Sequence, residues 1–389
     1  MGQPRTSITG RCVLQTHSGV LAMPAYNKDG QEIREAFDVQ GNALFQAYDM
    51  AGNEILNDVF PGRLLVWHDE FDGEEVDSAK WGHLFGYYNS HRYYMYKDNL
   101  AHNAFIENGI LHVTNQKDSD KSLTDWTGAY IWTNGKFEFR YGLIEAKIKF
   151  PDNPVYHSSF WTLGAGYDRI SAENAIPDAS KGLVWATCGE IDIAEADNGS
   201  VSTTKHWAVP SSNTHTSGGH ASIEADAAGW HIYGCEWTET EIKIYVDRVL
   251  KSTFTISTAT SEGYNAFQKP HFLIFNQLPH LNGTQEEDYL ETEVAWVRVY
   301  APESVTEYIE ETAISIDASA SLAAGETHLL DAAFTPENPS DMTLVWESSD
   351  DSVAICYGGK ITAIAAGSAI ITCTSKHGKT AVCYVTVTE

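Results

Sequence analysis

The chain has 389 residues, of which 43% are hydrophobic and 12% aromatic, so it is long enough for two or three domains with sizeable cores. Its net charge of −28 argues against a nucleic-acid groove or an anionic membrane surface, because both require clustered Lys and Arg. No apolar run reaches the length of a membrane helix. The acidity suits a neutral substrate but selects no particular partner, and neither nucleic acid binding nor membrane insertion is expected.

The first sixty residues contain a repeat in which glycine recurs every 11 residues. Around the later glycines each copy is typical of a strand, a turn and a strand, because Gly adopts the positive φ that such turns need. Units this short cannot bury a core alone. They resemble the Tyr-Asp-x-x-Gly-Asn repeats of some phage-tail and surface proteins. Residues 1–62 are therefore predicted to form a β-repeat module, which either docks to a cell surface or virion or packs as an accessory layer. The repeated glycines are Gly19, Gly30, Gly41 and Gly52.

Residues 63–301 are rich in alternating apolar and polar positions, which indicate half-buried strands. Turn signals such as Asn108-Gly109 separate these segments, and no long helical period appears. Many strands at short spacing predict an all-β sandwich or barrel. The alternation is clearest in residues 136–140, 144–150, 241–246 and 294–300.

The C-terminal part begins with residues 302–311, an acidic stretch without periodicity that is predicted to be a linker. Residues 312–389 contain short β segments, a turn at Pro336–Pro339 and one Trp, a pattern that suits a small Ig-like sandwich. Three cysteines lie close together in this part of the sequence. One disulfide between two of them and three free buried thiols are the two alternatives. The three cysteines are Cys356, Cys373 and Cys383.

The sequence 188-CGEIDIAEA-196 places three carboxylates within six residues. Alternate residues of a strand share a face, so Glu190 and Asp192 point the same way. Glu195 would lie on the opposite face of a regular strand, and one bulge near Ile193-Ala194 would return it to the carboxylate face.

Such a cluster suits retaining glycoside hydrolysis, in which two carboxyl groups roughly 5–5.5 Å apart act as nucleophile and acid/base. Like charges at close range raise the pKa of one group, which keeps an acid protonated near neutral pH. An acidic solvated strand face and calcium ligation are the alternatives, although the spacing lacks the Asp-x-Asp-x-Asp-Gly form of a calcium loop.

Several ordered blocks from about Leu64 to Tyr300 resemble glycoside hydrolase family 16, in particular its laminarinase-like, bulged branch. The resemblance implies a concanavalin-like β-jelly-roll with a cleft across its concave sheet. It makes Glu190 the nucleophile, Asp192 its assistant and Glu195 the acid/base. It also implies cleft or substrate-binding roles for His206, Trp161, Trp185, Asn276 and Gln277. The blocks are residues 65–73, 107–114, 135–149, 160–164, 189–195, 230–238, 245–247 and 297–300.

The sequence departs from this family in two places. A Gly-Gly-Asn-Trp segment is replaced by residues 277–284, where His280 could take a binding role. The family's structural calcium uses an early Glu, a backbone carbonyl and a late Asp, which correspond here to Glu70, Gly109 and Ala295. Because Ala295 offers no carboxylate, the case for a structural calcium site is weakened. No cofactor or catalytic metal is expected.

Residues 312–389 resemble bacterial Ig-like domains of the invasin/intimin type, through residues 322–326, 334–338, 345–350 and 363–367. This implies a spacer or adhesion module without catalysis of its own.

The combined prediction is a retaining endo-β-glycanase that hydrolyses a β-1,3- or β-1,3/1,4-glucan. A galactan hydrolase of the agarase, carrageenase or porphyranase type and a non-catalytic carbohydrate-binding protein are the alternatives. An extracellular or cell-surface location is expected, with a phage virion as the alternative. Residues 1–5 lack the apolar core of a secretory signal, so either a signal has been removed or the protein leaves its cell another way.

Overall fold

The computed structural model describes residues 14–16, 19–21, 25–26, 32–37, 43–48, 54–56, 60, 62–88, 93–95, 99–118, 126–151, 156–167, 182–197, 200–224, 227–279 and 288–389. These residues divide into two units, Met1–Arg63 and Leu64–Glu389. Strands make up nearly all of the regular structure, which confirms the predicted all-β class. Within the described ranges, no helix has the length and apolar character needed to cross a membrane.

The N-terminal unit consists of short antiparallel strands, as the glycine repeat predicts. β1 (Leu14–Thr16) pairs with β2 (Gly19–Leu21). A separate four-stranded sheet has the order β3-β4-β5-β6. Its strands are β3 (Ala25–Tyr26), β4 (Glu32–Phe37), β5 (Ala43–Tyr48) and β6 (Glu54–Leu56). The turns at Gly30, Gly41 and Gly52 lie outside the described residues, and the docking role of this unit stays a prediction.

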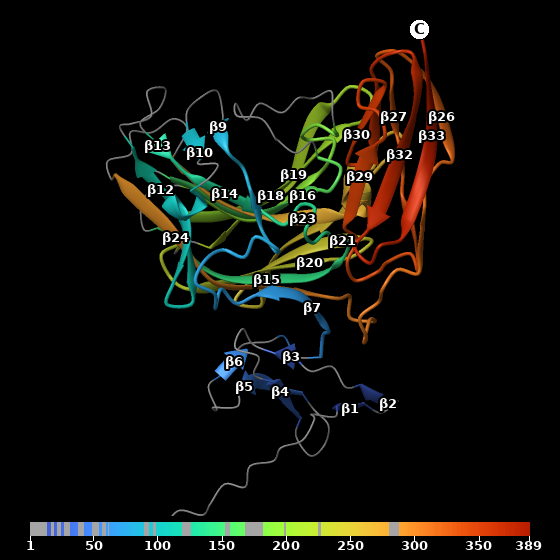
Figure 1. The fold of residues 1–389 in the computed structure, drawn as a ribbon. Coiled ribbons are helices and arrows are strands. Elements are labelled where there is room, and N and C mark those ends of the chain that lie inside the picture. The colour runs from blue at the N-terminus through green and yellow to red at the C-terminus, as the bar shows by residue number, and fades with distance from the viewer. Residues whose placement is uncertain are drawn as a thin grey trace, which may run out of the picture. The chain divides into compact units, whose positions relative to one another are not determined.

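The second unit begins with a two-sheet jelly roll, visible in Figure 1 as two stacked layers of strands. Its seven-stranded sheet has the order β19-β18-β17-β16-β23-β14-β8. The strands of this sheet are β8 (Gly82–His83), β14 (Ala129–Trp132), β16 (Tyr156–Gly164), β17 (Glu190–Asp197), β18 (Ser200–Val209), β19 (Thr214–Glu224) and β23 (His271–Pro279).

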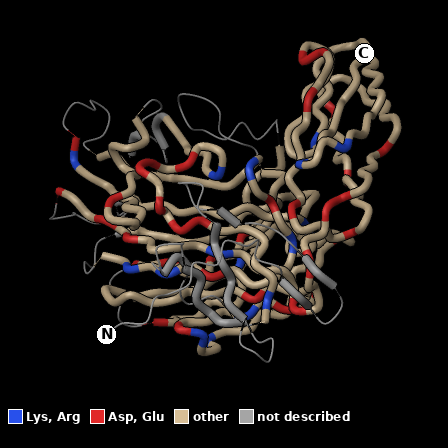
Figure 2. The backbone as a smooth tube through the Cα atoms, turned by 60° about the horizontal axis from the view of Figure 1, so that its bottom comes forward, with Lys and Arg blue, Asp and Glu red and all other residues tan. Residues whose placement is uncertain are grey.

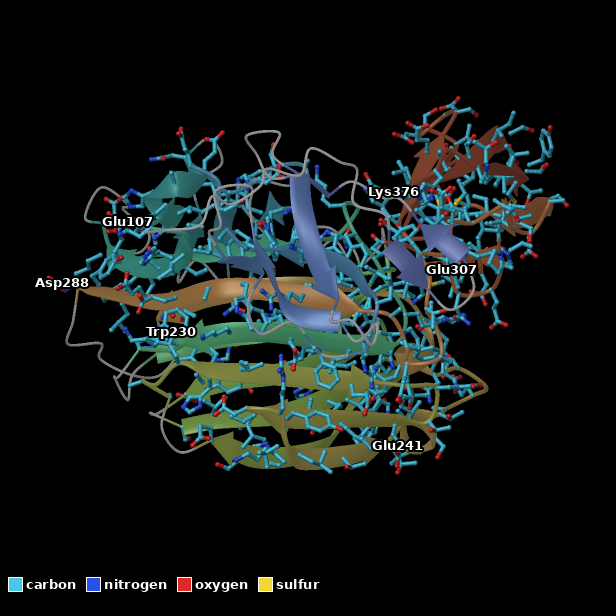
Figure 3. All side chains as sticks on the ribbon, turned by 90° about the horizontal axis from the view of Figure 1, so that it is seen from below. Glu107, Trp230, Glu241, Asp288, Glu307 and Lys376 are labelled. Atoms are coloured by element: carbon cyan, nitrogen blue, oxygen red, sulfur yellow. The ribbon has the colours of Figure 1, made fainter. Side chains whose placement is uncertain are left out.

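The eleven-stranded sheet covers the other side of the core, with β22-β21-β20-β15-β24-β12-β13-β10-β9 as its main order. Figure 3 shows β24, β15, β20 and β21 side by side across its outer face, with Trp230 and Glu241 toward opposite ends. β11 and β7 pair at the side with β12 and β24. The strands are β7 (Leu65–Asp69), β9 (Gly86–Tyr88), β10 (Tyr93–Met95), β11 (Ala104–Glu107), β12 (Ile110–Lys117), β13 (Trp126–Thr127), β15 (Gly142–Lys149), β20 (His231–Trp237), β21 (Glu241–Val246), β22 (Val249–Thr255) and β24 (Tyr289–Tyr300). Among the described residues, the 3-10 turn η1 (Leu100–His102) precedes β11, and η2 (Ile256–Ala259) and η3 (Ala266–Gln268) lie between β22 and β23 of the other sheet.

Apolar side chains from facing strands fill the space between these two sheets. Ile148 and Val297 come from the larger sheet, and Phe160, Ile191 and Phe275 come from the smaller one. Burial of each such side chain stabilises the fold by about 1.5–3 kcal/mol. Because Ile191 faces this core, its neighbours Glu190 and Asp192 face the opposite, concave side of the smaller sheet.

The Ig-like domain contains a four-stranded sheet, a three-stranded sheet and a two-stranded pair. Their orders are β26-β33-β32-β29, β27-β31-β30 and β25-β28. Cys356, Cys373 and Cys383 are buried free thiols, which decides between the two alternatives left by the sequence. The strands are β25 (Ala313–Ser315), β26 (Ser319–Ala323), β27 (Thr327–Leu329), β28 (Ala333–Thr335), β29 (Leu344–Ser348), β30 (Ala354–Tyr357), β31 (Lys360–Ala363), β32 (Gly367–Ser375) and β33 (Thr380–Thr388).

Residues 302–311, predicted as a linker, are bound to the Ig-like domain. The Ile309 backbone exchanges two hydrogen bonds with Ser340, at 2.8 and 2.9 Å. The buried Glu311 carboxylate accepts from Ser375 and from the His377 ring. Hydrogen bonds of this kind hold the segment in one conformation. The predicted domain limits at 62, 301 and 312 stay predictions.

Charged residues are distributed without a basic stripe in the described part of the chain. Figure 2 shows Asp and Glu positions interspersed with the fewer Lys and Arg positions along the strands and turns. A groove for a polyanion would need clustered basic side chains. The absence of nucleic acid among the partners stays a prediction.

Candidate active site

The three carboxylates of the motif lie on β17, on the concave face of the seven-stranded sheet. The register between β17 and β18 shifts between Asp192 and Glu195, and the register with β16 shifts at the same place. On β16, neighbouring residues pair with Ala194 and Asp192, so Ile193 is the extra residue. The predicted bulge is therefore confirmed, and it turns Glu195 to the same face as Glu190 and Asp192.

Glu190 is buried and accepts a hydrogen bond from Trp185 Nε1 at 3.0 Å. Burial and the charge of Asp192 raise the pKa of Glu190 well above its usual range, whereas the Trp185 N–H lowers it and Glu195 raises it. Ionisation of Glu190 is therefore unfavourable in this buried position beside the charge of Asp192.

Glu195 is the more exposed of the two glutamates, with 29% of its side chain accessible. Burial and the charge of Asp192 raise the pKa of Glu195 to about 7, an effect that His206 partly opposes. His157 on β16 approaches its carboxylate at 3.7 Å, from Nε2 to Oε1. A carboxyl group with this pKa is suited to donating and accepting protons near neutral pH.

His206 on β18 lies between the carboxylates. Its Nε2 is 3.2 Å from Asp192 Oδ2 and 3.7 Å from Glu190 Oε1. These contacts place the imidazole ring against both carboxylates. The other ring nitrogen, Nδ1, is 2.9 Å from Nε2 of His215 on β19.

Trp185 and the two histidines form a stack beside Glu190. The ring centroids of Trp185 and His215 are 4.7 Å apart, and the His206 and His215 rings stack at 5.1 Å. Trp185 is 42% exposed, so its ring presents a face on which a sugar could stack.

Trp161 and Asn276 lie further along the same face. Trp161 pairs with Asp192 across β16 and β17 and is partly buried. Its Nε1 donates to Asn276 Oδ1 at 2.6 Å, while the Asn276 Nδ2 has no hydrogen-bond partner among the described residues. A buried amide donor of this kind is available to a ligand hydroxyl.

Gln277 points the other way, into the space between the sheets. It is fully buried, and its Oε1 accepts from Ser158 and, at 2.7 Å, from Thr292. Successive strand residues face opposite sides, so Asn276 and Gln277 could not both line the concave face. Gln277 is therefore not part of the candidate site.

Glu70, one of the residues considered for calcium, has another partner. Glu70 accepts two hydrogen bonds from Arg298, at 2.7 and 2.9 Å, so a cation there would compete with a guanidinium. On the concave face, the donor atoms of Glu190, Asp192 and His206 lie within 4.8 Å of one another, a spacing that a cation could also occupy.

His157 and His215 are site residues that sequence reasoning missed. Neither belongs to a motif, and each lies on a strand whose position beside β17 or β18 only the sheet order reveals. His280, considered for a binding role, lies outside the described residues.

Comparison with known families gives two matches. The profile of Glycosyl hydrolases family 16 matches residues 99–298, about half of the chain. The profile of the Bacterial Ig-like domain (group 2) matches residues 311–385.

Individual relatives match the jelly-roll part. The chain is 29% identical to Glucan endo-1,3-beta-glucosidase A1 of Niallia circulans over 241 residues, which is 55% of this chain and 33% of that protein. It is 27% identical to Beta-glucanase of Rhodothermus marinus, over 57% of this chain and 77% of that protein. The crystal structure of LamAcat from Zobellia galactanivorans superposes with a TM-score of 0.51 and 26% identity, over 61% of this chain and 97% of that one. The chain covers 33% and 36% of the length of the first two curated relatives it matches.

Proposed function

Because the chain belongs to glycosyl hydrolases family 16, we propose that it is an endo-β-glycanase that cleaves a β-1,3- or β-1,3/1,4-glucan with retention of configuration. The observation that carries this proposal is the bulge at Ile193, which gathers three carboxylates on one concave sheet face. The similarity to Glucan endo-1,3-beta-glucosidase A1 and to Beta-glucanase supports the choice of a glucan. The acidic net charge is consistent with a neutral polymer.

In the proposed mechanism, Glu190 attacks the anomeric carbon while Glu195 gives its proton to the departing glycosidic oxygen. Glu195 then takes a proton from water, which attacks the glycosyl-enzyme and releases Glu190. The Trp185 N–H stabilises the negative charge on Glu190.

Substrate binding is proposed to involve the aromatic and polar groups on the same face. Trp161 and Trp185 would stack on sugar rings, and the amide of Asn276 would donate to a hydroxyl. His206 would hold Asp192 and Glu190 in position. A polymeric substrate also implies action outside the cell, which we include in the proposal.

A polysaccharide panel tests the proposed function. Wild-type protein is expected to release reducing ends from laminarin, barley glucan or lichenan, with the β-anomer of the product appearing first by NMR. Agarose, porphyran and carrageenan serve as the galactan arm. Binding to a glucan without any release would indicate the non-catalytic alternative, and release from a galactan alone would replace the proposed substrate.

The pH dependence of kcat/KM is a second expected result. Glu195 must be protonated in the first step, and burial together with the charge of Asp192 raises its pKa to about 7. Activity should therefore fall about tenfold per pH unit once the pH rises above roughly 7. Initial rates at low substrate concentration, measured between pH 5 and pH 9, give the pH profile of kcat/KM and its decrease at high pH. A flat profile over the upper half of that range would contradict the assignment of Glu195.

A further inference from the structure

The Ig-like domain packs directly against the end of the jelly roll next to the candidate site. Met342 N donates to the Glu138 carbonyl at 2.6 Å, and Glu138 N donates to Thr343 Oγ1 at 2.9 Å. Lys269 adds an ion pair to Asp331 at 2.7 Å. The backbone bonds lie at buried residues, so they fix the position of one domain on the other more firmly than the exposed ion pair does.

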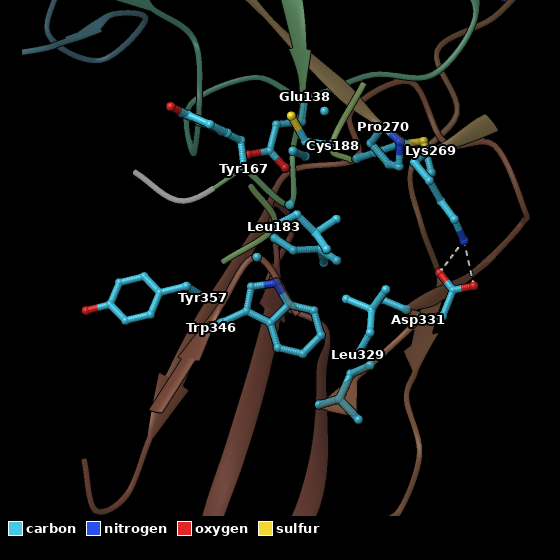
Figure 4. A pocket seen from close by; sticks show the side chains of 18 of the residues that line it. Glu138, Tyr167, Leu183, Cys188, Lys269, Pro270, Leu329, Asp331, Trp346 and Tyr357 are labelled. Atoms are coloured by element: carbon cyan, nitrogen blue, oxygen red, sulfur yellow. Dashed lines mark hydrogen bonds and ion pairs between the residues drawn. The ribbon is translucent and has the colours of Figure 1, made fainter. Parts of the chain in front are cut away.

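Between the two domains lies a cavity of about 220 Å³. Figure 4 shows Tyr167, Leu183 and Cys188 of the jelly roll on one side of it, and Trp346 and Tyr357 of the Ig-like domain on the other. Leu183, Tyr167 and Trp161 all pack against the same buried apolar cluster. The lining of the cavity and the Trp161 ring of the candidate site therefore share one apolar support.

Two glycines of the two domains also lie directly against each other. A Cβ atom on Gly358, in the turn between β30 and β31, would lie 2.6 Å from Gly166 Cα and 2.8 Å from its carbonyl oxygen. Lys360 Nζ, on the same hairpin, donates to the Gly182 carbonyl at 3.0 Å. Leu183 N in turn donates to the Gly166 carbonyl at 2.7 Å. The hairpin thus holds both Gly166 and Gly182.

The residues held in this way lead into the nucleophile. Gly182 and Leu183 begin the segment that carries Trp185 and continues through Cys188 into β17 at Glu190. On its other side this segment is held by Asn213, whose Nδ2 donates to the Trp185 carbonyl at 3.0 Å. The position of the Trp185 N–H against Glu190 therefore depends on contacts from both sides.

We propose that the Ig-like domain is a positioning element of the active site: its β30–β31 hairpin holds the Gly182–Leu183 segment so that Trp185 donates to Glu190. This inference rests on the proposed function for its effect on catalysis, and it adds a role to the spacer or adhesion module that the resemblance implies. Gly358 and Lys360 are positioning residues, since they act through Trp185.

The test compares two glycine substitutions in the full-length chain. Gly358→Ala introduces a methyl group against the Gly166 backbone, whereas the control Gly378→Ala adds one at another positive-φ turn of the same domain, with open space around it. Both variants carry a similar backbone strain, so the difference between them reports the domain contact. Lys360→Met, which removes the bond to Gly182, is the second test variant if Gly358→Ala does not fold.

Hydrogen exchange measured by mass spectrometry is the readout that needs no substrate. Amides of residues 182–189 are expected to exchange faster in Gly358→Ala and Lys360→Met, and to stay unchanged in Gly378→Ala. Unchanged exchange in the two test variants would overturn the inference, as would the same increase in the control. Hydrogen exchange gives a result even if the polysaccharide panel shows no glycanase activity. Failure of the proposed function can therefore be distinguished from failure of this inference.

The pH profile is the readout that a purely structural contact would not alter. Glu190 faces Asp192, Glu195, His206 and the Cys188 thiol. The Trp185 N–H donates to Glu190 and thereby favours the charged form of this carboxylate. If Trp185 is displaced, the pKa of Glu190 should rise, and the acid limb of kcat/KM should move to higher pH. Trp185→Phe removes this N–H completely and serves as the reference, with an expected loss of about tenfold or more in kcat/KM below neutral pH. The test variants should lose about threefold or more there, and an unmoved acid limb would overturn the inference.

Discussion

Replacement of Glu190 by Gln is expected to reduce glucan hydrolysis by about 10⁴-fold or more, because an amide cannot form the glycosyl-enzyme. The midpoint of thermal unfolding should stay close to the wild-type value. The Gln oxygen can still accept from Trp185, and the substitution removes a buried charge that lies beside Asp192. Reducing-end release and calorimetry on the same preparation measure both effects.

The matched control is Glu241→Gln, the same chemical change on β21 of the other sheet, where the carboxylate pairs with exposed Lys243. This variant should keep full activity, because a surface pair contributes little and lies away from the concave face. Turnover at the wild-type rate in Glu190→Gln would disprove its role as nucleophile. A large fall in the unfolding midpoint would instead make the loss of activity a folding effect.

Glu195→Ala is expected to reduce hydrolysis of the polysaccharide by about 10²- to 10⁴-fold, since the departing sugar oxygen then leaves without a proton. An aryl β-glycoside with a dinitrophenolate leaving group should lose far less in the first step, because that group needs no protonation. Added azide should restore turnover of the aryl substrate, since it attacks the glycosyl-enzyme without a base. The azide adduct should have the β configuration.

These two substrates separate an acid/base role from a binding role. If Glu195 only held the substrate, both substrates would lose activity to the same degree and azide would have no effect. That outcome would mean that another group supplies the proton, and His157 is a candidate, because its Nε2 is 3.7 Å from the Glu195 carboxylate. The companion substitution His157→Gln would then be the variant to measure.

The local parts of the fold were readable from the sequence because they depend on neighbouring residues. Alternation predicted the strands, and the spacing of Glu190, Asp192 and Glu195 on an alternating strand required a bulge, which lies at Ile193. The same alternation rule, applied to Asn276 and Gln277, would have shown that only one of them can share a sheet face with the carboxylates. Which of the two does so became clear only when β23 was placed between β16 and β14.

Contacts between distant segments could not be read in this way. His157 and His215 join the site because β16 and β19 lie beside β17 and β18, and no motif marks either residue. Residues 302–311 have the composition of a linker, yet Glu311 is buried against Ser375 and His377. The sequence around Gly358 indicates only a turn, and the tertiary structure shows that this turn packs against Gly166. Covalent spacing along the chain determines which residues share a strand face, whereas packing between strands and domains determines which faces meet, because that packing depends on the free energy of the whole fold.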